Sequence, residues 1–116
     1  MAVHTLSSGG RTAGHPPIVL QDAATTGDGD VLHVNGKTKE VSVYVDWGAG
    51  VGAGQVIVES ASSPSYAGTW APIATLNYLV NAEHLVQITG YLIALRARIS
   101  SDITGGTVTV TAGGIE

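Results

Sequence analysis

The sequence predicts an all-β fold, an antiparallel two-sheet β-sandwich of about eight strands, jelly-roll-like, with an extended N-terminal arm. Two observations lead to this prediction. From Ile18 onward, apolar residues recur at every second position, which is the period of a half-buried strand and not that of a helix. The short apolar runs are separated by Gly, Asp, Asn and Pro, the residues typical of turns. A closed barrel is the alternative arrangement of such strands.

The N-terminal segment, residues 1–17, is predicted to be an arm, and residues 18–116 a single sandwich domain. A chain of 116 residues suits one hydrophobic core. In the arm, Gly9, Gly10, Pro16 and Pro17 interrupt any regular period, and the prolines offer no amide to a sheet. The arm is therefore either a frayed terminus or an element that docks on a neighbouring subunit.

The strands expected in chain order share short length, alternation and flanking turn residues; they span 18–23, 31–34, 40–47, 55–60, 69–76, 84–89, 91–100 and 107–112. Asn35-Gly36 and Gly105-Gly106 are tight-turn signals. Residues 77–83 fit either a turn or one helical turn. In the strand over 91–100, Arg96 and Arg98 alternate with apolar residues, so both are expected to point outward.

The charge content is the most informative part of the composition. Only 12% of residues are Asp, Glu, Lys or Arg, against roughly 25% in an average globular protein. The surface must then consist largely of Thr, Ser, Gly, Asn and Ala. Such a surface either keeps the protein in solution through uncharged polar groups or makes close contacts with other proteins. A net charge of −4 with five basic residues disfavours nucleic acid and an anionic membrane as partners.

From this sequence we expect no signal peptide, no membrane-spanning helix and no disulfide bond. The segment from Met1 to Gly14 lacks the basic start and apolar centre of a signal peptide. No aliphatic stretch approaches the ~20 residues of a membrane helix. The sequence contains no cysteine, so neither a disulfide framework nor a thiolate metal site can form.

The glycines and histidines do not fit the motifs of cofactor or metal sites. Glycines alternate through 48–54, but a strand follows them where a phosphate loop needs a helix and a Lys-Ser/Thr pair. The four histidines show no ligand-pair spacing, and no Gly-x-Ser-x-Gly elbow is present. We therefore expect no cofactor, no metal, no catalytic residue and no enzymatic activity.

Two acidic arrangements remain as weaker alternatives. Asp22, Asp28 and Asp30 could hold a calcium ion, although their spacing is not that of an EF-hand and a plain acidic turn explains them. Asp46 and Glu59 could form a glycosidase pair only if the fold brought them close together.

The aromatic residues allow a binding alternative. Trp47, Tyr66, Trp70 and Tyr78 could line a platform for a sugar, because aromatic faces stack on apolar sugar faces. Trp47 and Trp70 as anchors of the core are the favoured interpretation.

Three parts of the chain resemble a known group of proteins. They are the opening VLQDAATTGDG (19–29), the central VIVES (56–60) followed by GTWAPI (68–73), and the final YLIALRARI (91–99) followed by GGTVTV (105–110). In this order the three resemble small virion structural proteins of tailed bacteriophages, most closely the capsid decoration, or cement, proteins. The motifs do not separate head decoration from tail or baseplate components.

The resemblance implies a non-enzymatic protein that binds the outer surface of the assembled phage head and bridges capsomers. It implies the major capsid protein as partner, a homo-oligomer such as a trimer, synthesis in the host cytoplasm and a location on the virion. The candidate protein contacts lie in the arm and on one outer strand face: His4, Arg11, His15, Pro16, Pro17, Arg96 and Arg98. The two arginines are either a solvated stripe or contacts to a carboxylate on a partner. A tail or baseplate component and a carbohydrate-binding module are the alternative functions.

Overall fold

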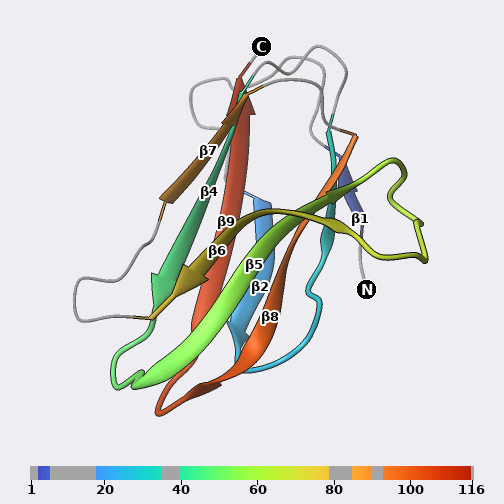
Figure 1. Cartoon of the computed structure of the whole chain (residues 1–116). Coiled ribbons are helices and arrows are strands. Elements are labelled where there is room, and N and C mark those ends of the chain that lie inside the picture. The colour runs from blue at the N-terminus through green and yellow to red at the C-terminus, as the bar shows by residue number, and fades with distance from the viewer. Residues whose placement is uncertain (1–2, 6–17, 35–39, 79–84, 90–92, 116) are drawn as a thin grey trace.

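The computed structural model of the chain describes residues 3–5, 18–34, 40–78, 85–89 and 93–115. In this part of the chain all regular elements are strands, and they form two sheets packed face to face (Figure 1). The strands are β1 (Val3–Thr5), β2 (Ile18–Ala24), β3 (Val31–His33), β4 (Glu40–Trp47), β5 (Ala53–Ala61), β6 (Ala71–Asn77), β7 (Leu85–Thr89), β8 (Ala94–Thr104) and β9 (Val108–Ile115).

The strand order is that of a jelly roll. One sheet has the order β1-β3-β8-β5-β6 and the other β2-β9-β4-β7. Strands β2 to β9 form nested antiparallel pairs, first with last: β2 with β9, β3 with β8, β4 with β7 and β5 with β6. Such nesting arises when one long hairpin wraps around a common core. The predicted antiparallel sandwich with jelly-roll architecture is therefore confirmed.

The core lies between the two sheets and is mostly valine and leucine. On β4 the alternation places Val41, Val43 and Val45 inward and Ser42, Tyr44 and Asp46 on the other face. The main inward residues of the other strands are Leu20, Val56, Val58, Leu76, Leu95, Ala97, Ile99, Val108, Val110 and Ala112. Trp47 meets Tyr78 edge to face, with ring centroids 5.6 Å apart, against this core.

Several strands extend beyond their predicted ends. Strand β8 continues to Thr104 rather than ending at Ser100, β9 continues to Ile115, and β5 begins at Ala53. Most of the extra residues are polar, glycine or alanine and add little to the alternating pattern, whereas Ile103 is buried in the core. Backbone pairing such as Ala53 with Thr104 keeps these ends extended. Strand β6 begins at Ala71, two residues later than predicted, because Trp70 leaves the sheet to pack on its outer face.

Two glycine turns meet at the end of the sandwich near residue 105. The Gly48 amide donates to Thr107 O, and the Gly52 amide to Thr104 O, both at 2.8 Å. Gly50 and Gly105 have φ of +88° and +83°, and a Cβ on either would collide with the other's carbonyl oxygen. The alternating glycines therefore allow one backbone to lie directly on another, which explains them without a phosphate ligand.

Only three residues of the predicted arm lie within the described structure. Val3–Thr5 pairs in parallel with β3 as the edge strand of its sheet, with Val3 opposite Val31. Residues 6–17 lie outside the described residues, so the division into arm and domain remains a prediction. The described residues also contain no helix long and apolar enough to cross a membrane.

Candidate interaction surfaces

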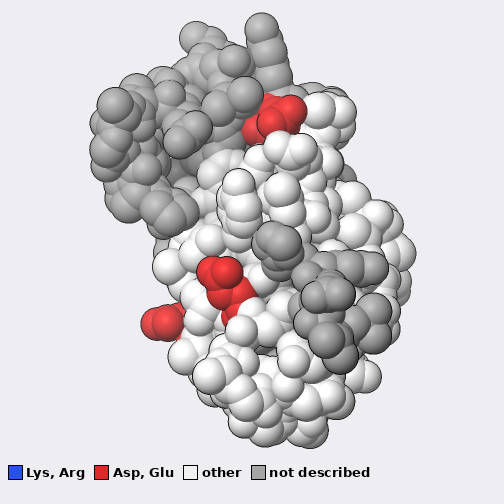
Figure 2. All heavy atoms as spheres, turned by 90° about the vertical axis from the view of Figure 1, so that its left-hand side faces the viewer, with Lys and Arg blue, Asp and Glu red and all other residues white. Residues whose placement is uncertain are grey.

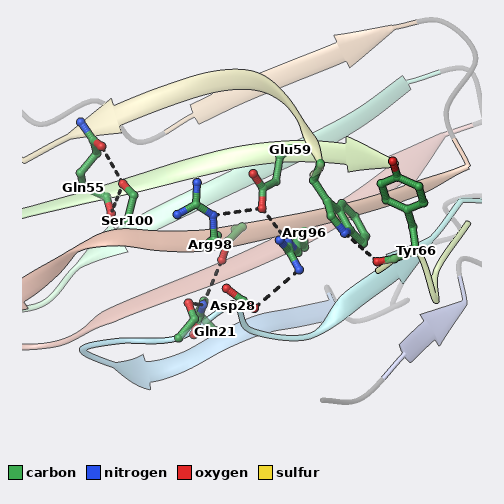
Figure 3. Close-up of polar contacts among 11 residues, drawn as sticks. Gln21, Asp28, Gln55, Glu59, Tyr66, Arg96, Arg98 and Ser100 are labelled. Carbon is green, nitrogen blue, oxygen red and sulfur yellow. Dashed lines mark hydrogen bonds and ion pairs between the residues drawn. The ribbon is translucent and has the colours of Figure 1, made fainter. Parts of the chain in front are cut away.

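The outer face of the five-stranded sheet carries a buried ion cluster (Figure 3). Glu59 on β5 lies opposite Arg96 on β8, and the neighbouring position on β8 facing the same way is Arg98. Glu59 Oε1 accepts hydrogen bonds from Arg96 Nε at 2.6 Å and from Arg98 Nε at 3.2 Å. Glu59 is only 3% exposed. A carboxylate this deeply buried is tolerated because charged donors compensate for its lost hydration.

The loop between β5 and β6 covers Arg96. Arg96 lies over the Trp70 ring, with the guanidinium carbon 4.4 Å from the ring centroid, a cation–π geometry. The Trp70 indole donates to Tyr66 O at 3.1 Å, and the ring packs with Val31 and Ala94 in a small cluster separate from the main core. Arg96 Nη1 also lies 3.6 Å from Asp28 Oδ2. This cluster therefore holds the loop to the sheet.

A buried glutamine connects the two sheets. Gln21 on β2 donates from Nε2 to Ala97 O of β8 at 2.9 Å and to Gly27 O at 3.1 Å. Strand β3 pairs with β8 only at positions 94–96. The Gln21 side chain supplies the donor for the next outward carbonyl of β8, Ala97 O, where that pairing ends. Both Leu20 and Gln21 are buried because bulges interrupt the β2–β9 register.

The structure brings together two of the residues predicted as protein contacts. Arg96 and Arg98 lie on one face as expected, but the carboxylates that they contact are Glu59 and, for Arg96, Asp28 of the same chain. His4 lies in the edge strand β1. Arg11, His15, Pro16 and Pro17 lie outside the described residues. Contact of any of these residues with a partner remains a prediction.

The sequence did not predict that Glu59 contacts Arg96 and Arg98 or that Gln21 connects the two sheets. Glu59 did leave a signal, since it is the only charged residue in the apolar run 56–61, opposite a strand with two arginines. That signal becomes readable only once the β5–β8 register is known. Gln21 left none, because the bulge that turns it inward is not visible in the alternation.

The alternative chemical sites do not assemble. Asp46 lies on the outer face of the four-stranded sheet and Glu59 on the outer face of the other sheet, so they do not form a catalytic pair. Among the described residues, no three His, Asp or Glu side chains come close enough together to hold a metal ion. Trp70 is buried beneath its loop, and Trp47 packs on Tyr78, so the four aromatic residues do not form one platform.

The outer face of the four-stranded sheet exposes a row of apolar side chains. The residue pairs Val19–Thr111, Thr111–Tyr44 and Tyr44–Leu85 are in register, so these four residues cross the sheet from edge to edge. The three large side chains are 39% (Val19), 46% (Tyr44) and 41% (Leu85) exposed. We call Val19, Thr111, Tyr44 and Leu85 the apolar row.

The two sides of the apolar row differ in charge. On one side the next positions are Ser42, Gly113 and Gln87, which are uncharged, and Glu40 lies one pair further from the row. On the other side lie Asp46 and its partner Thr109. Exposed Asp22 is on the edge strand β2, next to Ala23, whose amide donates to Thr109 Oγ1. Figure 2 looks at the molecule from the side of this sheet and shows Asp and Glu, but no Lys or Arg, among the described residues in view.

The fold and these surfaces define the chain as a jelly-roll β-sandwich whose two outer faces carry an ion cluster and an apolar row flanked by acidic residues. No protein-family model matches the sequence, and no curated protein matches it. A solved structure with the same fold is the crystal structure of SPBc2 prophage-derived protein YomS, with a TM-score of 0.64. The alignment covers 91% of this chain and 100% of that chain at 14% sequence identity, a level at which the likeness establishes the fold.

Proposed function

We propose that this chain is a non-enzymatic structural protein of a tailed-phage virion, a capsid decoration protein that binds the outside of the assembled head and bridges capsomers. The observation that carries the proposal is the apolar row, which crosses all four strands on the outer face of its sheet and exposes three large side chains. An exposed apolar patch of this kind typically marks a protein contact.

The two buried polar side chains of the described residues, Gln21 and Glu59, have structural explanations. Glu59 and its arginines stabilise a loop, and Gln21 connects the two sheets. These arrangements favour a structural role over catalysis. The shared fold with a prophage-derived protein supports a phage origin by analogy, since fold alone does not define function.

The mechanism follows from repeated contacts on a lattice. In a homo-oligomer such as a trimer, the first contact with the major capsid protein makes the later ones intramolecular, so their combined strength exceeds that of one contact. A protein that binds the assembled shell and not free subunits stabilises the shell by mass action. The edge strand β1 is already paired by its backbone, and an arm of this kind can add to a neighbour's sheet in the same way.

Immunogold labelling of virions of the phage that encodes the chain tests the proposal. We expect label on heads, and we expect heads that lack the protein to release DNA at a lower temperature or after a milder osmotic shock than normal heads. Label confined to the tail or baseplate would contradict the proposed decoration function and would indicate a structural role in the tail. Absence of label from virions, combined with specific binding on a glycan array, would replace it by carbohydrate binding.

A further inference from the structure

We infer that the outer face of the four-stranded sheet docks on a shell-protein surface that has an apolar centre and Lys or Arg side chains on one side of it. This inference rests on the proposed function and adds the surface and the chemistry of the partner. It is carried by the register of the apolar row and by the charges that flank it.

The apolar row has the form of an interface centre. Val19, Tyr44 and Leu85 come from β2, β4 and β7, and Thr111 of β9 continues the line between Val19 and Tyr44. Three of the six exposed large hydrophobic side chains of the described residues therefore lie in one line. Protein interfaces commonly consist of an apolar centre and a polar rim, with aromatic residues as anchors. Tyr44, the most exposed of the three and between the other two, is the expected anchor.

The flanking charges give the partner its sign and its orientation. Asp46 lies two residues from Tyr44 on the same face and pairs with Thr109. Exposed Asp22 lies close to this pair, because the amide of the next residue, Ala23, donates to Thr109 Oγ1. On the opposite flank Ser42 and Gln87 are neutral, and Glu40 lies on the same face two residues beyond Ser42. Because Asp46 lies closer to the apolar row than Glu40, a partner that places Lys or Arg beside Asp46 gains more in this orientation than in the reverse one.

A second copy of the chain fits this face less well. If two copies met through the same face, the acidic residues beside both apolar rows would lie in one interface and would repel each other. The described arginines, Arg96 and Arg98, lie on the outer face of the other sheet. Contact between opposite faces of successive copies is heterologous, and stacking that does not close produces an open fibre rather than a small oligomer. The charges therefore favour a basic surface of a different protein.

Binding of the purified full chain to heads that lack it tests the inference. Heads from a phage with the gene deleted are mixed with wild-type protein or variants, and bound protein is measured after sedimentation. We expect Tyr44→Ser and Leu85→Ser each to weaken binding at least about tenfold, since interface anchors contribute more than about 1.4 kcal/mol. Asp46→Lys should weaken binding by a similar factor and should reduce its dependence on salt.

Matched controls come from the other sheet. Ile73→Ser removes a side chain that is 40% exposed, close to the 41% of Leu85, and Asp102→Lys reverses an exposed acid of β8. Both controls should bind like wild type, and circular dichroism with thermal unfolding establishes that every variant is folded.

The outcomes separate the two proposals. Failure of the wild-type protein to bind heads would overturn the decoration function and the docking inference with it. Wild-type binding together with normal binding by folded Tyr44→Ser, Leu85→Ser and Asp46→Lys would overturn the docking face alone. Light scattering adds one further outcome: if Tyr44→Ser dissociates a wild-type oligomer, the face joins copies of this chain and the inference about the shell is wrong.

Discussion

Glu59 Oε1 lies 2.6 Å from Arg96 Nε, and both side chains are largely withdrawn from water on the outer face of a sheet. Arg98 Nε shares the same oxygen at 3.2 Å. Because the carboxylate neutralises a mostly buried guanidinium, its removal leaves that cation with Asp28 at 3.6 Å as its remaining acidic contact among the described residues. We expect Glu59→Gln to lower the free energy of unfolding by about 3 kcal/mol, as measured by urea unfolding.

Glu40→Gln is the control for this substitution. Glu40 begins β4 on the other sheet and lies outside the cluster, so its neutralisation should change the free energy of unfolding by no more than about 0.5 kcal/mol. Equal effects of the two substitutions would show that the Glu59 cluster contributes nothing specific to stability.

A second prediction concerns the glutamine that connects the sheets. Gln21→Leu keeps a side chain of similar size but leaves Ala97 O and Gly27 O without their side-chain donor. Gly27 O keeps the Ile99 amide as a donor, whereas the buried Ala97 O loses its side-chain donor. An unsatisfied buried acceptor costs about 1–3 kcal/mol, so we expect a loss of this size in the free energy of unfolding, measured with urea. Gln87→Leu, at an exposed position of β7, is the matched control and should be close to neutral. A neutral Gln21→Leu would mean that water replaces the amide at no cost.

The difference between Glu59 and the core valines shows what the sequence could and could not predict. Val41, Val43 and Val45 are inward because alternation alone decides their face, and that pattern was sufficient to predict the sandwich. The roles of Glu59 and Gln21 depend on which strands are neighbours and on where bulges shift the register. The apolar row has the same origin, since Val19, Tyr44 and Leu85 are separated in sequence and meet only through the strand order.

Trp70 gives a third prediction, on local stability. Its ring covers Arg96, and its indole holds Tyr66 O, so Trp70→Ala should release the loop of residues 62–69 from the sheet. Because Trp70 packs in the small cluster with Val31 and Ala94 and not in the main core, the sandwich should remain folded. Limited proteolysis should cut the variant within 62–69 much faster than wild type. Tyr66→Ala keeps the backbone acceptor of Trp70 and should leave the loop protected; cleavage at the wild-type rate in Trp70→Ala would contradict the prediction.

The last prediction compares two positions near Gln21, Ala23 and Gly29, both with positive φ. Glycine should be the more stable residue at both, so the substitutions Ala23→Gly and Gly29→Ala should have opposite effects on stability. Ala23 has φ of +46°, a region that costs an L-residue about 1–2 kcal/mol, and its side chain is exposed. Ala23→Gly should therefore stabilise the protein by about 0.5 kcal/mol, after the larger entropy of the unfolded glycine chain is subtracted.

Gly29 has φ of +73°, and a Cβ there would lie 2.6 Å from both Gln21 Nε2 and Leu20 O. Gly29→Ala thus adds backbone strain and displaces the glutamine from its two carbonyls, and we expect a loss of more than about 2 kcal/mol. Both variants are measured by urea unfolding against wild type. Since the two effects of Gly29→Ala share one side chain, its cost should fall when it is combined with Gln21→Leu. Strict additivity in this double-mutant cycle would mean that the cost is backbone strain alone and that Gln21 is not displaced.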